Sequence, residues 1–94
     1  MENLLKSLNQ NFTPGGWSAS DINSEKIQHI TKWIIMSMFG NQPDYSIVYA
    51  EQQVVAGMNY KIVLTIDISG KKEFWEFLVY DHFGKYSITN SRIL

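Results

Sequence analysis

Residues 60–69 alternate between two kinds of side chain, and this pattern constrains the fold more than any other feature of the chain. One face of the segment carries Tyr60, Ile62, Leu64, Ile66 and Ile68. The other face carries Lys61, Val63, Thr65 and Asp67. A period of two residues is that of a β-strand with one buried face, as in many antiparallel sheets. We therefore expect an antiparallel sheet whose apolar face is covered by another element of the chain.

Three more long strands are expected after Pro43. They are predicted at residues 45–55, 73–81 and 86–93, and a short strand is expected ahead of them at residues 17–19. The turn signals lie between these segments, at residues 69–72 and 82–85, and each includes a glycine. Consecutive strands joined by such short turns predict a meander.

The covering element is predicted to be a helix over about residues 24–39. Its apolar stripe consists of Ile27, Ile30, Ile34 and Met38, widened by Trp33, Ile35 and Phe39. Asp21 and Asn23 are the candidate N-caps. Gly40 and Asn41 form the expected stop, and Pro43 prevents continuation.

Together these elements predict an α+β fold, with a four- or five-stranded antiparallel sheet wrapped around one long helix. Residues 13–94 are expected to form a single domain. Residues 1–12 form an N-terminal leader whose apolar residues recur at roughly helical spacing, so it is either a short helix or a frayed terminus.

Composition excludes several classes of function. A net charge of -1 with eight scattered basic residues gives no footprint for nucleic acid. The chain has no cysteine, which excludes a disulfide framework and a cysteine nucleophile and favours a cytoplasmic, reducing location. No apolar run is long enough for a membrane span, and no secretory signal is visible. The two histidines, His29 and His82, are isolated, so we expect no metal, no cofactor and no enzymatic activity.

Residues 53–57 have an unusual composition for a turn between two strands. Turns usually recruit polar residues and glycine, whereas Val54, Val55 and Ala56 crowd this position between Gln53 and Gly57. Exposed there, these side chains would form an apolar tip that suits a partner's cleft. Alternatively, the three apolar residues belong to the strand core and the turn lies at residues 57–59.

Two other segments have compositions that ordinary connections do not require. One is Pro14, Gly15 and Gly16 ahead of the helix, and the other is the turn of His82, Phe83 and Gly84. In a helix-and-meander fold, these segments and the apolar tip can all reach the same end of the sheet. Trp17, next to the first segment, is expected to pack in the core or against the helix.

The chain resembles the cystatins, and most closely the stefins, which are cystatins without disulfides. Residues 14–19 (PGGWSA) resemble the stefin opening, and residues 25–30 resemble the first turns of the stefin helix. Residues 53–60 (QVVAGMNY) resemble the stefin signature QVVAGTNY, and residues 77–80 resemble the strand before the second hairpin loop. Where stefins carry Leu-Pro or Pro-Trp in that loop, this chain has Phe83 and Gly84, so a weaker contact is expected.

The resemblance implies a reversible, competitive inhibitor of papain-like, cathepsin-type cysteine proteases. The implied contact residues are Pro14, Gly15, Gly16, Gln53, Val54, Val55, Ala56, Gly57, His82, Phe83 and Gly84. The alternative is a cystatin-fold interaction module that does not inhibit proteases. We expect a monomer, with a domain-swapped dimer as the competing state.

Overall fold

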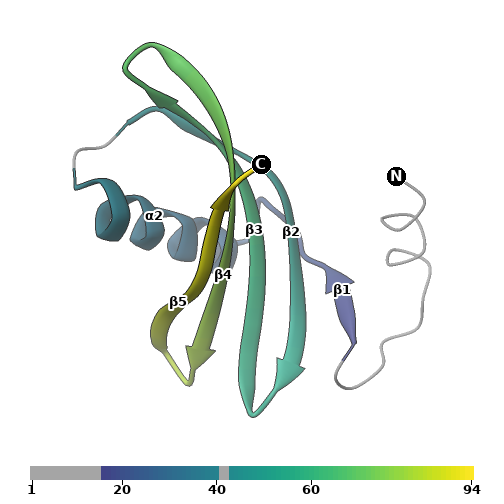
Figure 1. Ribbon diagram of the computed structural model, residues 1–94. Coiled ribbons are helices and arrows are strands. Elements are labelled where there is room, and N and C mark those ends of the chain that lie inside the picture. The colour runs from purple at the N-terminus through teal and green to yellow at the C-terminus, as the bar shows by residue number, and fades with distance from the viewer. Residues whose placement is uncertain (1–15, 41–42) are drawn as a thin grey trace.

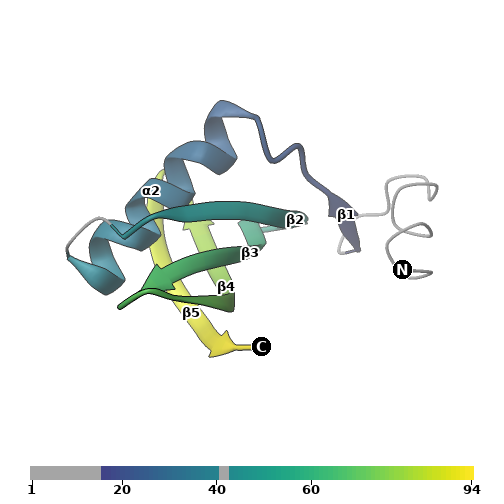
Figure 2. The ribbon, with the colours of Figure 1, turned by 90° about the horizontal axis from the view of Figure 1, so that it is seen from above.

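The computed structural model describes residues 16–40 and 43–94. Its elements follow the order β1 (Trp17–Ala19), α2 (Glu25–Phe39), β2 (Tyr45–Val55), β3 (Gly57–Ile68), β4 (Lys71–His82) and β5 (Lys85–Ile93). The strands form one sheet in the order β1-β2-β3-β4-β5, with every neighbouring pair antiparallel. The helix lies across one face of this curved sheet, as Figures 1 and 2 show from two directions. The predicted α+β fold is therefore confirmed, whereas the predicted leader at residues 1–12 lies outside the described residues.

The core forms where the apolar face of α2 meets the inner face of the sheet. Tyr60, Ile62, Leu64 and Ile66 are buried as their alternation predicted, and Ile68 is partly buried at the core's edge. Across from β3, the core continues through Phe77 and Val79 of β4 and Ala50 of β2. Burying one such large side chain stabilises the fold by about 1.5–3 kcal/mol, so the sheet and the helix hold each other in place.

The N-cap of the helix lies one position after the nearer of the two predicted caps, Asn23. Ser24 is the N-cap, and its side-chain oxygen accepts a hydrogen bond from the Ile27 amide at 3.2 Å. The predictions of Asp21 and Asn23 as caps were wrong. Asp21 instead accepts a hydrogen bond from the Asn23 amide at 2.9 Å, which forms a turn just before the helix.

The buried face of α2 also differs from the predicted apolar stripe at the C-terminal end of the helix. Met38 was expected inside, yet 42% of it is exposed, while Thr31 is fully buried. Because 3.6 residues make one turn, the face towards the sheet drifts along the helix from Ile27 through Thr31 and Ile35. In the last turn Phe39 occupies this face and packs edge-on against Trp75, with ring centroids 5.6 Å apart.

Two irregularities shape the sheet. The register of β2 against β3 shifts between Ile47 and Tyr49, which leaves Val48 48% exposed. The register of β4 against β5 shifts between Leu78 and Val79, with Thr89 as the extra residue. Such bulges increase the local twist and bend a sheet, consistent with its curvature around the helix.

Candidate functional site

The turn between β2 and β3 presents an apolar tip. Val55 pairs with Gly57, so Ala56 stands alone at the apex. Met58 pairs with Val54 and is therefore already inside β3, which makes the alternative turn at residues 57–59 wrong. Val55 is 40% exposed and Ala56 is also exposed, so this tip offers apolar surface to solvent. We call residues 54–57 the first tip.

Gly57 is required at the first tip for two physical reasons. Its φ of 105° lies in the region that favours glycine. A Cβ at this position would also lie 2.6 Å from the backbone oxygen of Asp81 and 3.1 Å from the Tyr80 hydroxyl. The close approach of β4 to the start of β3 therefore depends on the missing side chain.

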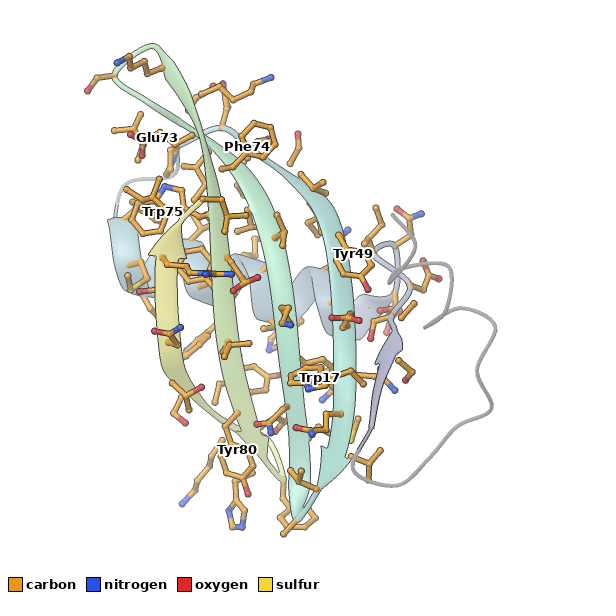
Figure 3. The ribbon with its side chains drawn as sticks, turned by 45° about the vertical axis from the view of Figure 1, so that its right-hand side comes forward. Trp17, Tyr49, Glu73, Phe74, Trp75 and Tyr80 are labelled. Carbon is orange, nitrogen blue, oxygen red and sulfur yellow. The ribbon has the colours of Figure 1, made fainter. Side chains whose placement is uncertain are left out.

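Two side-chain hydrogen bonds hold the first tip from the outer face of the sheet, which is the face away from α2. The Tyr80 hydroxyl donates to the carbonyl oxygen of Ala56, and Figure 3 shows Tyr80 at this end of the sheet. Three residues from the apex on either side, the Asn59 side chain donates a hydrogen bond to Gln53 Oε1 at 2.9 Å. The apex carbonyl is thus satisfied by a neighbouring strand rather than by its own hairpin.

The turn between β4 and β5 lies beside the first tip and exposes an aromatic ring. We call residues 82–84 the second turn. Phe83 is 82% exposed, and its ring lies 5.0 Å from the imidazole of His82 in an edge-on arrangement. Phe83 has a φ of 52° and Gly84 a φ of 97°, the pair of positive values that a tight hairpin turn needs. Because Phe is not glycine, its left-handed conformation costs about 1–2 kcal/mol.

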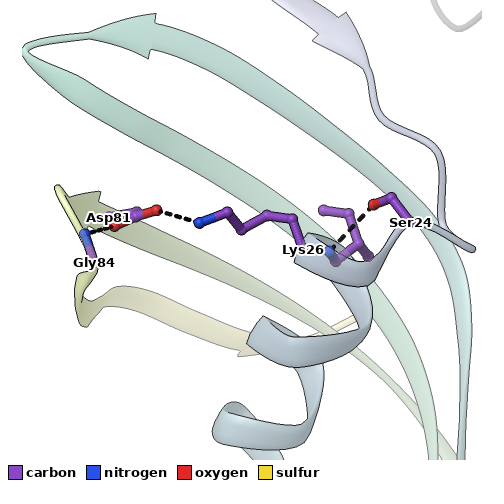
Figure 4. Close-up of polar contacts among 5 residues, drawn as sticks. Ser24, Lys26, Asp81 and Gly84 are labelled. Atoms are coloured by element: carbon purple, nitrogen blue, oxygen red, sulfur yellow. Dashed lines mark hydrogen bonds and ion pairs between the residues drawn. The ribbon is translucent and has the colours of Figure 1, made fainter.

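Asp81 supports the second turn from inside the fold. It is 5% exposed, its Oδ1 accepts a hydrogen bond from the Gly84 amide at 2.7 Å, and its Oδ2 lies 3.2 Å from Lys26 Nζ. Figure 4 shows this connection from the second turn to the first turn of α2, which Ser24 caps. The hydrogen bond to Asp81 raises the pKa of Lys26, so the ammonium is further stabilised in its charged form.

The start of β1 reaches the same end of the sheet. Trp17 pairs with Gln53, so Gly16 precedes β1 on the side of the first tip, as the strand directions in Figure 1 show. The expectation that Trp17 packs in the core or on the helix was wrong. It lies on the outer face, where Lys61 Nζ is 4.9 Å from its ring centroid. Because Gln53 points outward in β2, its partner Trp17 must do so too.

The structure therefore brings two sequence-predicted segments, and the last residue of a third, to one end of the sheet. Gly16, the first tip with Gln53, and the second turn all lie there, and a shallow hollow lined by both the first tip and the second turn runs between them and Lys26. Pro14 and Gly15 lie outside the described residues. Whether any of these residues touches a protease stays a prediction.

Sequence reasoning missed the residues that hold this end together, namely Lys26, Tyr80 and Asp81. One signal was available. Asp81 continues the inward-facing series of Trp75, Phe77 and Val79, and a carboxylate at a buried position needs a specific partner. The identity of that partner, Lys26, was not readable from spacing along the chain.

Within residues 16–40 and 43–94, no group of three or more His, Cys, Asp or Glu side chains could hold a metal ion. In the same residues, no helix has the length and apolarity to cross a membrane. This end of the sheet offers an apolar surface, formed by the first tip, the second turn and the start of β1, whose backbone geometry is fixed. We call this surface the edge.

The fold is that of the cystatins. A salivary cystatin from the soft tick Ornithodoros moubata has a TM-score of 0.71 at 22% identity, covering 87% of this chain and 99% of that one. Mialostatin, a gut cystatin from the hard tick Ixodes ricinus, has a TM-score of 0.65 at 15% identity, covering 84% of this chain and 97% of that one. Al-CPI has a TM-score of 0.59 at 19% identity, covering 85% of this chain and all of its own.

Sequence comparison agrees with the fold. A rice protein (Oryza sativa subsp. japonica) named "Putative cysteine proteinase inhibitor 7" is 32% identical over an alignment of 75 residues, which covers 73% of this chain. The match spans 64% of the length of that relative. No protein-family model matches the chain. These similarities agree with the resemblance to the cystatins that the sequence motifs carry.

Proposed function

We propose that this protein is a reversible, competitive inhibitor of papain-like cysteine proteases, including cathepsin-type enzymes. The observation that carries the proposal is the convergence of an apolar first tip, an exposed Phe83 and the start of β1 at one end of the sheet. The rice relative named as a cysteine proteinase inhibitor and the cystatin fold give it independent support.

In the proposed mechanism, this edge occludes the active-site cleft without being cleaved. Gly15 lets the backbone pass close to the protease's catalytic cysteine, with Pro14 and Gly16 on either side. Val54, Val55 and Ala56 enter the cleft beyond the catalytic cysteine, and His82 with Phe83 packs on its far side. The transfer of a valine from water into such a cleft contributes about 1.5–3 kcal/mol.

The fixed geometry of the edge makes this binding favourable. Antiparallel pairing leads up to Ala56 from both sides, and Asp81 holds the second turn. Little conformational entropy then remains to be lost on association, which leaves more of the contact energy as affinity.

The stefin subgroup, a cytoplasmic location and a monomeric active state belong to the same proposal. The motif at residues 53–60 and the absence of cysteine support the first two. The monomer is favoured because a domain-swapped dimer would straighten the first tip and remove it from the edge. Gel filtration of the active fraction tests the oligomeric state, and imaging of the tagged protein in its own cells tests the location.

Titration of active papain and a cathepsin-L-like enzyme with this protein tests the inhibition. Val55→Asp should weaken inhibition, because a charge would enter an apolar contact. Val48→Asp is the matched control, since Val48 is similarly exposed on the same strand but lies far from the first tip. Gly15→Glu and removal of residues 1–15 probe the N-terminal segment. Absence of inhibition at high micromolar concentration would exclude the proposed function.

A specific feature keeps a second function open, that of an interaction module without inhibition. The second turn carries Phe83 and Gly84 where stefins carry proline, so its contact surface differs from theirs. A stable non-protease partner captured by the intact protein, together with no inhibition of the protease panel, would favour this function.

A further inference from the structure

We infer that Tyr80 and Asp81, adjacent residues of β4, are positioning residues that hold the first tip, the second turn and the start of α2 as one unit. The inference rests on the proposed function only where it concerns inhibition, because the physical coupling exists in the free protein.

Tyr80 acts on the outer face. Its hydroxyl donates to the carbonyl oxygen of Ala56, the one residue between the ends of β2 and β3. An apex carbonyl has no partner across its own hairpin, so without Tyr80 it would turn to solvent. The phenol thus fixes the direction of the peptide at the apex and, with it, the direction in which Val55 and Ala56 are presented.

Asp81 acts on the inner face, because successive side chains of a strand point to opposite sides. Both of its carboxylate oxygens are engaged, one by the Gly84 amide at 2.7 Å and the other by Lys26 Nζ at 3.2 Å (Figure 4). A buried carboxylate that lost either partner would remain poorly compensated. The second turn and the first turn of α2 are therefore held by the same side chain.

The backbone of Asp81 links the two halves of this arrangement. Asp81 pairs with Met58. Its carbonyl oxygen lies only 2.6 Å from the position that a Cβ of Gly57 would occupy. Any displacement of Asp81 therefore moves it against or away from the start of β3. The first tip and the second turn cannot rearrange independently while this contact and the Tyr80 hydrogen bond persist.

Amide hydrogen exchange on the free protein tests the coupling. Tyr80→Phe removes only the hydroxyl, and Asp81→Asn removes the charge while keeping an acceptor for Gly84. We expect each variant to speed exchange in both residues 54–58 and residues 82–85. Tyr49→Phe and Asp67→Asn are the matched controls, because both residues lie on the outer face away from this end. If each variant loosened only its own hairpin, or the controls loosened both segments equally, the coupling would be refuted.

Dissociation kinetics of the papain complex test the positioning role. The loss of one tip-orienting hydrogen bond should raise the dissociation rate constant about 3- to 10-fold, with a smaller change in association. Faster exchange with unchanged dissociation would overturn the positioning role. A parent protein that fails to inhibit refutes the proposed function instead, and exchange then decides the coupling alone. Should Asp81→Asn not fold, Lys26→Met breaks the same ion pair from the more exposed partner.

Discussion

Phe83 and Ser69 adopt the same left-handed backbone conformation, with a φ of 52° at each, in hairpin turns at opposite ends of the sheet. Each is followed by a glycine with positive φ, Gly84 or Gly70. Asparagine tolerates this conformation better than either residue. Substitutions at these two residues can therefore separate the stability of a turn from its role in binding, because only Phe83 lies at the candidate edge.

We predict opposite effects of Phe83→Asn on stability and on inhibition. Relief of backbone strain should stabilise the fold by about 1 kcal/mol, because the ring is largely exposed and little packing is lost. Inhibition should weaken, because the exposed ring is removed from the edge. Urea unfolding and protease titration measure the two effects. Ser69→Asn should stabilise similarly without changing inhibition, and a loss of inhibition in that variant would contradict the assignment of the edge.

Gly57→Ala should destabilise the protein more than Gly70→Ala. Both glycines have positive φ, so each substitution carries backbone strain of about 1–2 kcal/mol. A Cβ at Gly70 meets nothing within 4 Å, whereas at Gly57 it meets the Asp81 backbone oxygen at 2.6 Å. The difference between the two free energies of unfolding isolates this contact. Equal destabilisation by the two substitutions would show that β4 can move away from a Cβ at residue 57 with no loss of folding free energy.

Thr31→Val should stabilise the protein by about 1 kcal/mol. The Thr31 hydroxyl is fully buried, and within the described part of the chain it has no hydrogen-bond partner. Valine keeps the shape and removes the unsatisfied polar group. Thr89→Val is the control, since its exposed hydroxyl donates to the Leu78 carbonyl at 3.2 Å and nothing is gained by its removal. Chemical denaturation distinguishes them, and a destabilised Thr31→Val would indicate that the hydroxyl is satisfied.

Stability should fall in alkaline solution. Burial raises the pKa of Tyr60, burial and a hydrogen bond to Glu51 raise the pKa of Tyr49, and the hydrogen bond to Asp81 raises the pKa of Lys26. In each case the folded state holds the proton more tightly than the unfolded state. The contribution of these groups to the free energy of unfolding is therefore fully present at neutral pH. It should decline once pH exceeds the ordinary values of 10.0 for tyrosine and 10.5 for lysine.

Urea unfolding between neutral pH and about pH 12 measures this decline. Tyr60→Phe and Lys26→Met should each flatten it, because each removes one of the titrating groups. A free energy of unfolding that rises over this range would contradict the assigned directions.

Local sequence patterns predicted most of the fold. The alternation at residues 60–69 identified β3 and its buried face, because side-chain direction in a strand follows directly from position. The stripe from Ile27 to Ile34 identified α2 for the corresponding reason. The errors in α2 fall at its two ends, at Ser24 and Met38, where capping geometry and the angle of the helix on the sheet decide the outcome.

The sequence by itself also determined the composition of the candidate edge, since the apolar residues before Gly57 and the exposed Phe83 are local properties of two turns. Only the tertiary structure decided that these turns lie side by side and share one set of supports. Tyr80 reaches Ala56 across 24 positions of the chain, and Lys26 reaches Asp81 across 55. Such contacts depend on strand register and on the placement of the helix, which arise from the packing of the whole core rather than from any short segment.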